Sequence, residues 1–444
     1  MTMEPRLLIE ERLRRLFQHL GIDRAHVAGR LPSDWRGLAT TFPEMVASLT
    51  LLGPTTVDAQ SVAPLASRLL VITGDRGPTA ENVRAAMARL REASVVFLPG
   101  YSLLGWSDVV ADRPDDIGSA LLHFLSQVKS PPGRDVASPA EKEGEIAGIS
   151  YRIQGAGPPL VLLPLFLAPS QWDPLVNRLS ERYCTITLGG TELGAVAILE
   201  SRGRAPGYLQ MVRTLIEEAE LQPGETVLEV GCGTSVLDRW LARRTGGKNP
   251  IVGVDINRYL LREAAALVSK DGLEGTIALR EGNAEALPFP DGSFDVTMAV
   301  TVIEELDADR MLGEMVRVTR SGGRVAVVAR AMDVPFLMNL PLGAPLQSKV
   351  EAPGLVGNVS PQGCADRSLY RRVHEAGLIR AKMFAHLVSF DRADTTLVQF
   401  MEAAFVPKLT QDERREWQAA RAEAEAQGTF FMAWPHHCVV GTKP

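Results

Sequence analysis

The sequence of 444 residues has few cysteines, few aromatic residues and no long apolar run. Its four cysteines lie far apart and form no C-x-x-C pair, so neither a disulfide framework nor a zinc site is predicted. No apolar run has the length of a membrane span, and the N-terminus has no signal-peptide core. No lysine- or arginine-rich block accompanies the formal charge of −6. We therefore expect a cytoplasmic protein that neither spans a membrane nor binds nucleic acid.

The length predicts two domains, each large enough to bury its own core. We place the first at residues 1–195 and the second at residues 205–444. A stretch rich in charge, proline and small residues, about 131–147, is typical of a linker and interrupts the first domain.

The run Val227–Ser235 is an apolar stretch that breaks into a glycine-rich turn, and a helix-compatible sequence follows. This order predicts the first strand, loop and helix of a nucleotide-binding sheet. Side chains at Gly231 and Gly233 would block both the turn and the approach of a ligand to the backbone amides. A second apolar strand ends at Asp255, roughly twenty residues later, where a carboxylate can bind ribose hydroxyls. Because Val236 stands where G-x-G-x-x-G has its third glycine, we expect a nucleoside site rather than a pyrophosphate site.

Several ordered motifs carry a resemblance to a known family. They are Glu229-x-Gly231-x-Gly233, Gly253–Asn257, Gly282–Phe289, Ser293–Val296 and Ser321–Val328. Together they resemble the class I S-adenosylmethionine-dependent methyltransferases, and most of all the small-molecule branch typified by the ubiquinone/menaquinone C-methyltransferases. The resemblance covers roughly the last 240 residues.

The expected fold class is α/β. The resemblance implies a Rossmann-like seven-stranded methyltransferase sheet in the C-terminal domain, with a reversed final hairpin. From the apolar runs we place its strands near 225–230, 251–255, 277–281, 294–300, 323–330, 381–390 and 430–441. A smaller α/β-hydrolase-like parallel-sheet module is expected in the N-terminal domain.

The same resemblance implies roles for individual residues. Glu229 and the amides around Gly231 and Gly233 would hold the amino-acid end of the cofactor, and Asp255 the ribose. The rest of the predicted cofactor site is Cys232, Ile256, Asn257, Asn283, Ala284 and Val300, of which Ile256, Asn283 and Ala284 would contact the adenine. Two alternatives stay open. Asp255 could instead cap a helix. The Cys232 thiol could have redox or nucleophilic chemistry, although a small apolar filler is the preferred interpretation.

Glu304 and Glu305 follow the fourth strand of the C-terminal domain, where an acceptor would lie. One of them could act as the general base or anchor a cation, and we name both as catalytic candidates. The alternative is that they are solvated carboxylates at a helix start.

The sequence His436-His437-Cys438, with Cys364, raises the alternative of a metal site or of a thiol or metalloid acceptor. Strand alternation puts His436 and Cys438 on one face and His437 on the other, so a core-lining strand without a metal is the preferred interpretation.

The N-terminal domain resembles the α/β-hydrolases in two pieces, through Leu20–Gly29, Phe42–Leu52, Leu69–Arg76 and Ala93–Gly100, and then Tyr151–Gly155 and Pro158–Pro164. The pieces occur in permuted order and could complete one sheet. Leu31 stands where the nucleophilic serine of G-x-S-x-G belongs, and no histidine occurs between His26 and His123. We expect a degenerate scaffold without esterase activity.

The connection Met332–Cys364 is long and apolar, which favours a lid over the cofactor and acceptor or packing against the N-terminal domain. The sequence thus predicts an S-adenosylmethionine-dependent methyltransferase acting on a small molecule. The rival is a ligand-binding sensor of the cofactor, built on the inactive hydrolase scaffold. For its assembly we allow for a homodimer.

Overall fold

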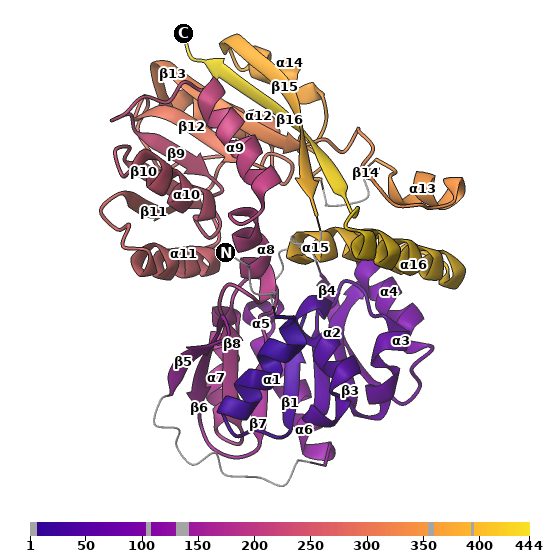
Figure 1. Ribbon diagram of the computed structural model, residues 1–444. Coiled ribbons are helices and arrows are strands. Elements are labelled where there is room, and N and C mark those ends of the chain that lie inside the picture. The colour runs from indigo at the N-terminus through magenta and orange to yellow at the C-terminus, as the bar shows by residue number, and fades with distance from the viewer. Residues whose placement is uncertain (1–6, 104–107, 130–141, 354–358, 392–394) are drawn as a thin grey trace. The chain divides into compact units, whose positions relative to one another are not determined.

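The computed structural model describes residues 7–103, 108–129, 142–353, 359–391 and 395–444 (Figure 1). The chain divides into two compact units, residues 1–197 and residues 198–444. Each unit has its own eight-stranded sheet. Across the described ranges, no helix combines the length and the apolar character that crossing a bilayer requires.

The first unit has strands in the order β4-β3-β2-β1-β7-β8-β6-β5. They are β1 (Ala25–Gly29), β2 (Val46–Leu52), β3 (Leu69–Arg76), β4 (Ser94–Ser102), β5 (Glu143–Ile146), β6 (Ile149–Gln154), β7 (Pro159–Leu162) and β8 (Cys184–Gly189). Its helices are α1 (Ile9–His19), α2 (Pro32–Thr41), α3 (Ala59–Val62), α4 (Gly77–Met87), α5 (Val109–Asp112), α6 (Pro114–Gln127), α7 (Asp173–Ser180) and the start of α8 (Gly194–Arg202).

Helices cover both faces of this first sheet. Its central strands are therefore buried along their whole length. One core contains residues of α1 and α2, and the other contains residues of α5, α6 and α7. Strand β1 pairs in parallel with β7, which confirms that the two sequence pieces complete one sheet. The relationship to hydrolases itself stays a prediction.

Two details of the first unit differ from expectation. The sheet is not wholly parallel, since β6 runs antiparallel to both β5 and β8. The end of the expected linker forms β5, because Ala147 and Gly148, both at positive φ, close a hairpin onto β6. The rest of that linker lies largely outside the described residues. Leu31 occupies the turn between β1 and α2, the place at which the resemblance to hydrolases would put a nucleophile.

Asp34 on α2 is buried beside this turn and accepts hydrogen bonds from the Gly194 amide at 3.1 and 3.2 Å. Burial raises the pKa of the Asp34 carboxyl to about 7. A raised folded-state pKa means that the proton-linked stability is complete below the unfolded pKa near 3.8 and is lost as the pH rises to about 7.

We therefore expect Asp34→Asn to be more stable than the wild type at pH 8, by about 2 kcal/mol, a figure discounted for the amide's own buried NH₂ group. The advantage should shrink as the pH falls toward 4. Urea unfolding of both proteins at pH 8 and pH 4.5 measures it. A difference independent of pH would show that folding does not raise the pKa of Asp34.

The second unit has strands in the order β11-β10-β9-β12-β13-β16-β14, and β15 pairs with β16. They are β9 (Val227–Val230), β10 (Ile251–Asp255), β11 (Ile277–Glu281), β12 (Phe294–Val300), β13 (Thr319–Arg330), β14 (Leu337–Met338), β15 (Ile379–Phe390) and β16 (Met432–Thr442). Its helices are α9 (Pro206–Glu218), α10 (Val236–Thr245), α11 (Arg258–Lys270), α12 (Ala308–Val318), α13 (Ala344–Val350), α14 (Ser368–Glu375), α15 (Thr395–Phe405) and α16 (Gln411–Gln427).

All seven predicted strands of the second unit are present, and the reversed final hairpin is confirmed by the antiparallel pairing of β16 with β13 and β15. The two-residue strand β14 is an unexpected addition. Helices α9 and α10 share a core on one face of the sheet, and α12 and α14 share a core on the other. The apolar residues between Phe336 and Val350 join the first of these cores, so this connection packs on its own unit.

Candidate functional site

The loop between β9 and α10 makes a tight turn through left-handed backbone conformations. Gly231, Gly233 and Ser235 have φ values of +75°, +54° and +59°. A Cβ on Gly231 would clash with Cγ2 of Val302 and lie 2.8 Å from its Cγ1. Glycine is therefore required at position 231 for two independent reasons, conformation and close approach. Ser235 tolerates its conformation while its hydroxyl donates to Oδ2 of Asp238 at 2.7 Å.

Gly231→Ala is expected to destabilise the protein by at least about 1–2 kcal/mol, the cost of a left-handed non-glycine residue, before any clash with Val302 is added. Thermal unfolding followed by circular dichroism measures this. Gly246→Ala is the matched control, because that glycine also has a positive φ, +61°, but a Cβ there would meet no atom within 4 Å. Equal losses in the two variants would show that Val302 does not press on the loop.

Asp255 at the end of β10 folds back onto the glycine loop. Its Oδ2 accepts a hydrogen bond from the Gly233 amide at 2.8 Å, and its Oδ1 accepts one from the Asn257 amide at 2.8 Å. Burial raises the pKa of the Asp255 carboxyl, and the amide hydrogen bonds oppose that rise. The alternative that Asp255 caps the next helix is wrong, because the Asn257 side chain caps α11 by accepting from the Tyr259 and Leu260 amides.

The loop amides are engaged within the chain. The amides of Gly231 and Cys232 both donate to the Val254 carbonyl, at 2.8 and 3.1 Å, and Gly233 donates to Asp255. The role of these amides toward the amino-acid end of a cofactor stays a prediction. Cys232 is 5% exposed, and burial raises the pKa of its thiol well above 9, as befits an apolar filler rather than a nucleophile.

Glu229 lies on β9 below the loop and is 3% exposed. Burial is the main cause of the rise in its pKa, and the neighbouring Asp238 carboxyl adds to it. Its Oε2 has no hydrogen-bond partner in the described part of the chain. A buried acceptor without a donor is costly, so a cationic donor bound at this place would be stabilised.

The expected adenine contacts lie at the ends of β10 and β11. Ile256 is 68% exposed, which is unusual for a large apolar side chain that directly follows a buried strand. Asn283 turns the chain by accepting from the Glu285 amide at 2.9 Å, and Ala284 is half-buried. Val300 is 4% exposed at the end of β12 and belongs to the core.

The two catalytic candidates have different environments. Glu304 is fully buried, and its Oε1 accepts from the backbone amide of Arg330 at 2.6 Å and from its Nε at 3.2 Å. The side chain of Glu305 is 35% exposed, 3.5 Å from Arg330, and burial of the rest raises its pKa. The alternative of a solvated carboxylate at a helix start is wrong for Glu304, because its side chain is buried. The residue that caps the next helix, α12, is Asp307. The general-base role stays a prediction, and only Glu305 has the exposure that it requires.

Two residues that precede the glycine loop, Glu200 and Arg202, contact the loop or the end of β12, and no sequence pattern predicts these contacts. Oε1 of Glu200 accepts from the Thr234 hydroxyl at 2.6 Å and from Arg239 at 2.5 Å. Arg202 at the end of α8 donates to the hydroxyl of Thr301 at 3.3 Å. These partners are separated by 34 to 99 residues, so no local pattern connects them.

The histidines of β16 line two cores. His436 faces the first core, packs edge-on against Tyr208 with ring centroids 6.4 Å apart, and has its pKa lowered to about 3 by burial. His437 faces the other side, where it bonds Asp333 at 2.8 Å and the Tyr370 hydroxyl at 2.9 Å. Nowhere in the described ranges do three or more His, Cys, Asp or Glu residues form a group that could hold a metal ion.

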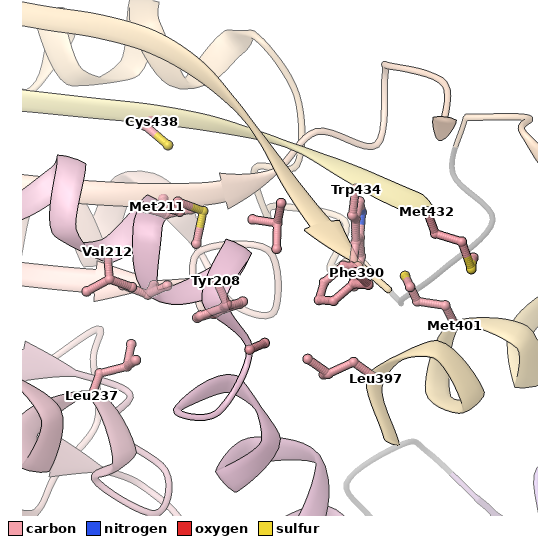
Figure 2. Packing of buried hydrophobic residues seen from close by; sticks show 14 of the residues in the cluster. Tyr208, Met211, Val212, Leu237, Phe390, Leu397, Met401, Met432, Trp434 and Cys438 are labelled. Carbon is pink, nitrogen blue, oxygen red and sulfur yellow. The ribbon is translucent and has the colours of Figure 1, made fainter. Parts of the chain in front are cut away.

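Apolar residues from distant segments meet beside this site. Figure 2 shows Tyr208 of α9, Phe390 of β15, Leu397 of α15 and Trp434 of β16 in one cluster, with Cys438 further along β16. Cys364 belongs to the core on the opposite face of the sheet. The two cysteines therefore cannot bind one metalloid together, and the alternative of a thiol acceptor stays a prediction.

Comparison with known proteins gives a family for part of the chain. Residues 228–327 match the family described as "Methyltransferase domain". The chain is 37% identical over 119 residues to "Methyltransferase GfsG" of Streptomyces halstedii, covering 27% of this chain and 42% of that protein. It is 36% identical over 141 residues to "Ubiquinone/menaquinone biosynthesis C-methyltransferase UbiE" of Hahella chejuensis, covering 29% and 57%. The chain thus spans about half the length of the curated relatives it matches.

Among solved structures, the YcgJ protein of Bacillus subtilis is 16% identical, with 53% of this chain and 98% of that chain covered. The TM-score is 0.36.

Proposed function

We propose that this chain, whose second unit contains a class I methyltransferase domain, transfers a methyl group from S-adenosylmethionine to a small-molecule acceptor. The observation that carries the proposal is the position of Asp255 at the end of β10, hydrogen-bonded to the glycine loop and directly followed by the exposed Ile256. A carboxylate beside an apolar surface suits a nucleoside, whose ribose accepts and donates hydrogen bonds and whose base is flat and apolar on its faces.

The acceptor groups of the site fit this cofactor. Asp255 uses one lone pair of each oxygen for an amide, and a carboxylate has about four in all, so it can still accept from two ribose hydroxyls. The orphaned Oε2 of Glu229 would accept from the cofactor's α-ammonium group. When bound, S-adenosylmethionine supplies an electrophilic methyl group on a sulfonium.

The chain's own contribution is positioning and proton removal. Holding an acceptor in line with a methyl group supplies much of the acceleration, and few acids or bases are required. Glu305 is the group placed to take a proton from the acceptor, since it is exposed and its pKa is raised. The front unit, on this proposal, assists assembly or shapes access to the site. The cytoplasmic location and the homodimer stay predictions.

The test is turnover. Incubation with a methyl-labelled donor and metabolite pools should release S-adenosylhomocysteine steadily and label one fraction of the pool. Binding of one cofactor per chain without release across all pools would instead support the sensor. Failure to bind S-adenosylhomocysteine at all would contradict both.

A further inference from the structure

Tyr208 of α9 has a buried hydroxyl group without a partner. The residue is 4% exposed, and its hydroxyl has no hydrogen-bond partner in the described part of the chain. The ring belongs to the apolar cluster that also contains Phe390 and Leu397 (Figure 2). Because leaving a buried hydroxyl unpaired is unfavourable, this group is suited to a polar atom of a bound molecule.

His436 of β16 offers an unpaired lone pair beside Tyr208. Its ring packs edge-on against the Tyr208 ring, with the centroids 6.4 Å apart, and its Nδ1 lies 3.0 Å from the backbone oxygen of Trp434. Since a carbonyl oxygen only accepts, Nδ1 carries the proton and Nε2 carries a lone pair. Burial lowers the pKa of the ring to about 3, which keeps it neutral. Among the described residues, none donates a hydrogen bond to Nε2.

Both residues lie at the carboxyl ends of the parallel strands. His436 is the register partner of Arg330, the last residue of β13. The Cζ of Arg202 lies 5.4 Å from the centroid of the Tyr208 ring, and Arg202 donates to Thr301, which directly follows β12, at 3.3 Å. Strands β12 and β13 pair in parallel, and α/β sheets bind small molecules at the carboxyl ends of such strands.

We propose that Tyr208 and His436 are specificity-determining residues that bind a hydroxyl group of the acceptor. This inference rests on the proposed function. Tyr208 donates to the oxygen of that hydroxyl group, and Nε2 of His436 accepts from it. A carboxylate has no proton to donate and an ammonium group has no lone pair, so neither satisfies both residues. The neighbouring side chains, which include Phe390, Leu397 and Trp434, match a molecule that is otherwise uncharged and largely apolar.

The two residues lie outside the part of the chain matched by the family, 228–327, so the match does not assign them. Tyr208 precedes that part and His436 follows it. On this proposal the pair positions the acceptor, whereas Glu305 keeps the proposed role of removing a proton.

Titrations followed by NMR of the ligand test the proposal on protein saturated with S-adenosylhomocysteine. The three probes are 4-propylphenol, 4-propyltoluene, which has a methyl group in place of the hydroxyl, and 4-propylbenzoate. The phenol should bind about 10-fold more tightly than the toluene, the range of one or two neutral hydrogen bonds. The benzoate should bind no more tightly than the toluene, because a buried carboxylate would meet the lone pair of Nε2.

Variants assign the preference to the two residues. Tyr208→Phe should weaken the phenol by roughly 3- to 10-fold, leave the toluene unchanged and not lower the melting temperature of the ligand-free protein. His436→Asn keeps a donor for the Trp434 carbonyl, removes the Nε2 lone pair and should weaken the phenol by a similar factor. Tyr370→Phe is the matched control, because that hydroxyl is bonded to His437 at 2.9 Å and its ring packs on the core of the opposite face. It should lower the melting temperature and change the binding of neither probe.

Three results for the wild type would overturn the inference and leave the proposed function standing. They are equal affinities for the phenol and the toluene, no binding of either probe, and tighter binding of the benzoate. An unchanged preference for the phenol in both Tyr208→Phe and His436→Asn would overturn it as well. Binding of S-adenosylhomocysteine is measured before the probes are added, and its failure would contradict the proposed function instead.

Discussion

Replacement of Asp255 by alanine should weaken S-adenosylhomocysteine binding by at least about 100-fold, since two charge-assisted hydrogen bonds to the ribose are lost at roughly 1.5 kcal/mol or more each. The structure adds a second cost. The Gly233 and Asn257 amides would lose their acceptor, and the loop under the cofactor would loosen. Isothermal titration calorimetry on the folded variant measures the change.

Two further variants separate the ribose contact from the loop contact. Asp255→Asn keeps one acceptor oxygen for the Gly233 amide and should give an intermediate loss. Glu281→Ala is the control, because Glu281 is the exposed register partner of Asp255 on β11 and should not alter binding. An unchanged dissociation constant for a folded Asp255→Ala protein would remove Asp255 from the site and take the main support of the proposed function with it.

Strands β9 and β10 could be predicted because each is a short apolar run that ends at a glycine-rich turn or at an acidic residue. Strand β9 is buried at every position, and β10 ends at the acidic residue that the spacing indicated. Strand β5 was missed for a physical reason. Its hairpin turns at Ala147 and Gly148, and alanine seldom adopts a positive φ, so the turn lacks the usual Asn-Gly or Asp-Gly signal.

Only part of the candidate site could be predicted from the sequence. Residues at the end of a strand or shortly after it, such as Asp255 and Glu305, can be placed from the sequence because the strand itself can be predicted. Residues that act across the fold are not: Glu304 looks like its neighbour Glu305, and only the structure shows that it is buried against Arg330. The same holds for Glu200 and Arg239, which lie on different helices and would pass for solvated charges.

The largest loss of stability is expected when the buried ion pair of Glu200 and Arg239 is broken. Arg239 is 6% exposed and donates to both oxygens of Glu200 at 2.5 and 2.6 Å, and to Asp271 at 2.9 Å. Arg239→Met would leave the carboxylate of Glu200, 7% exposed, buried without its cation. Removing one partner of a buried pair costs roughly 3–5 kcal/mol, so we expect a fall in melting temperature of about 10 °C.

Two comparisons decide whether the lost charge pairing is the cause. Arg244 lies on the same helix, and Arg244→Met breaks an exposed pair with Glu217 at 3.3 Å and a cation–π contact with Trp240, so it should change stability by no more than about 1 kcal/mol. The double variant Glu200→Met with Arg239→Met removes both charges and should recover much of the loss. Because Glu200 also accepts from the Thr234 hydroxyl, the double variant should still bind the cofactor more weakly than the wild type. Full stability in Arg239→Met would mean that the buried ion pair contributes no net stability. Full recovery of cofactor binding in the double variant would mean that the Glu200 contact does not hold the glycine loop.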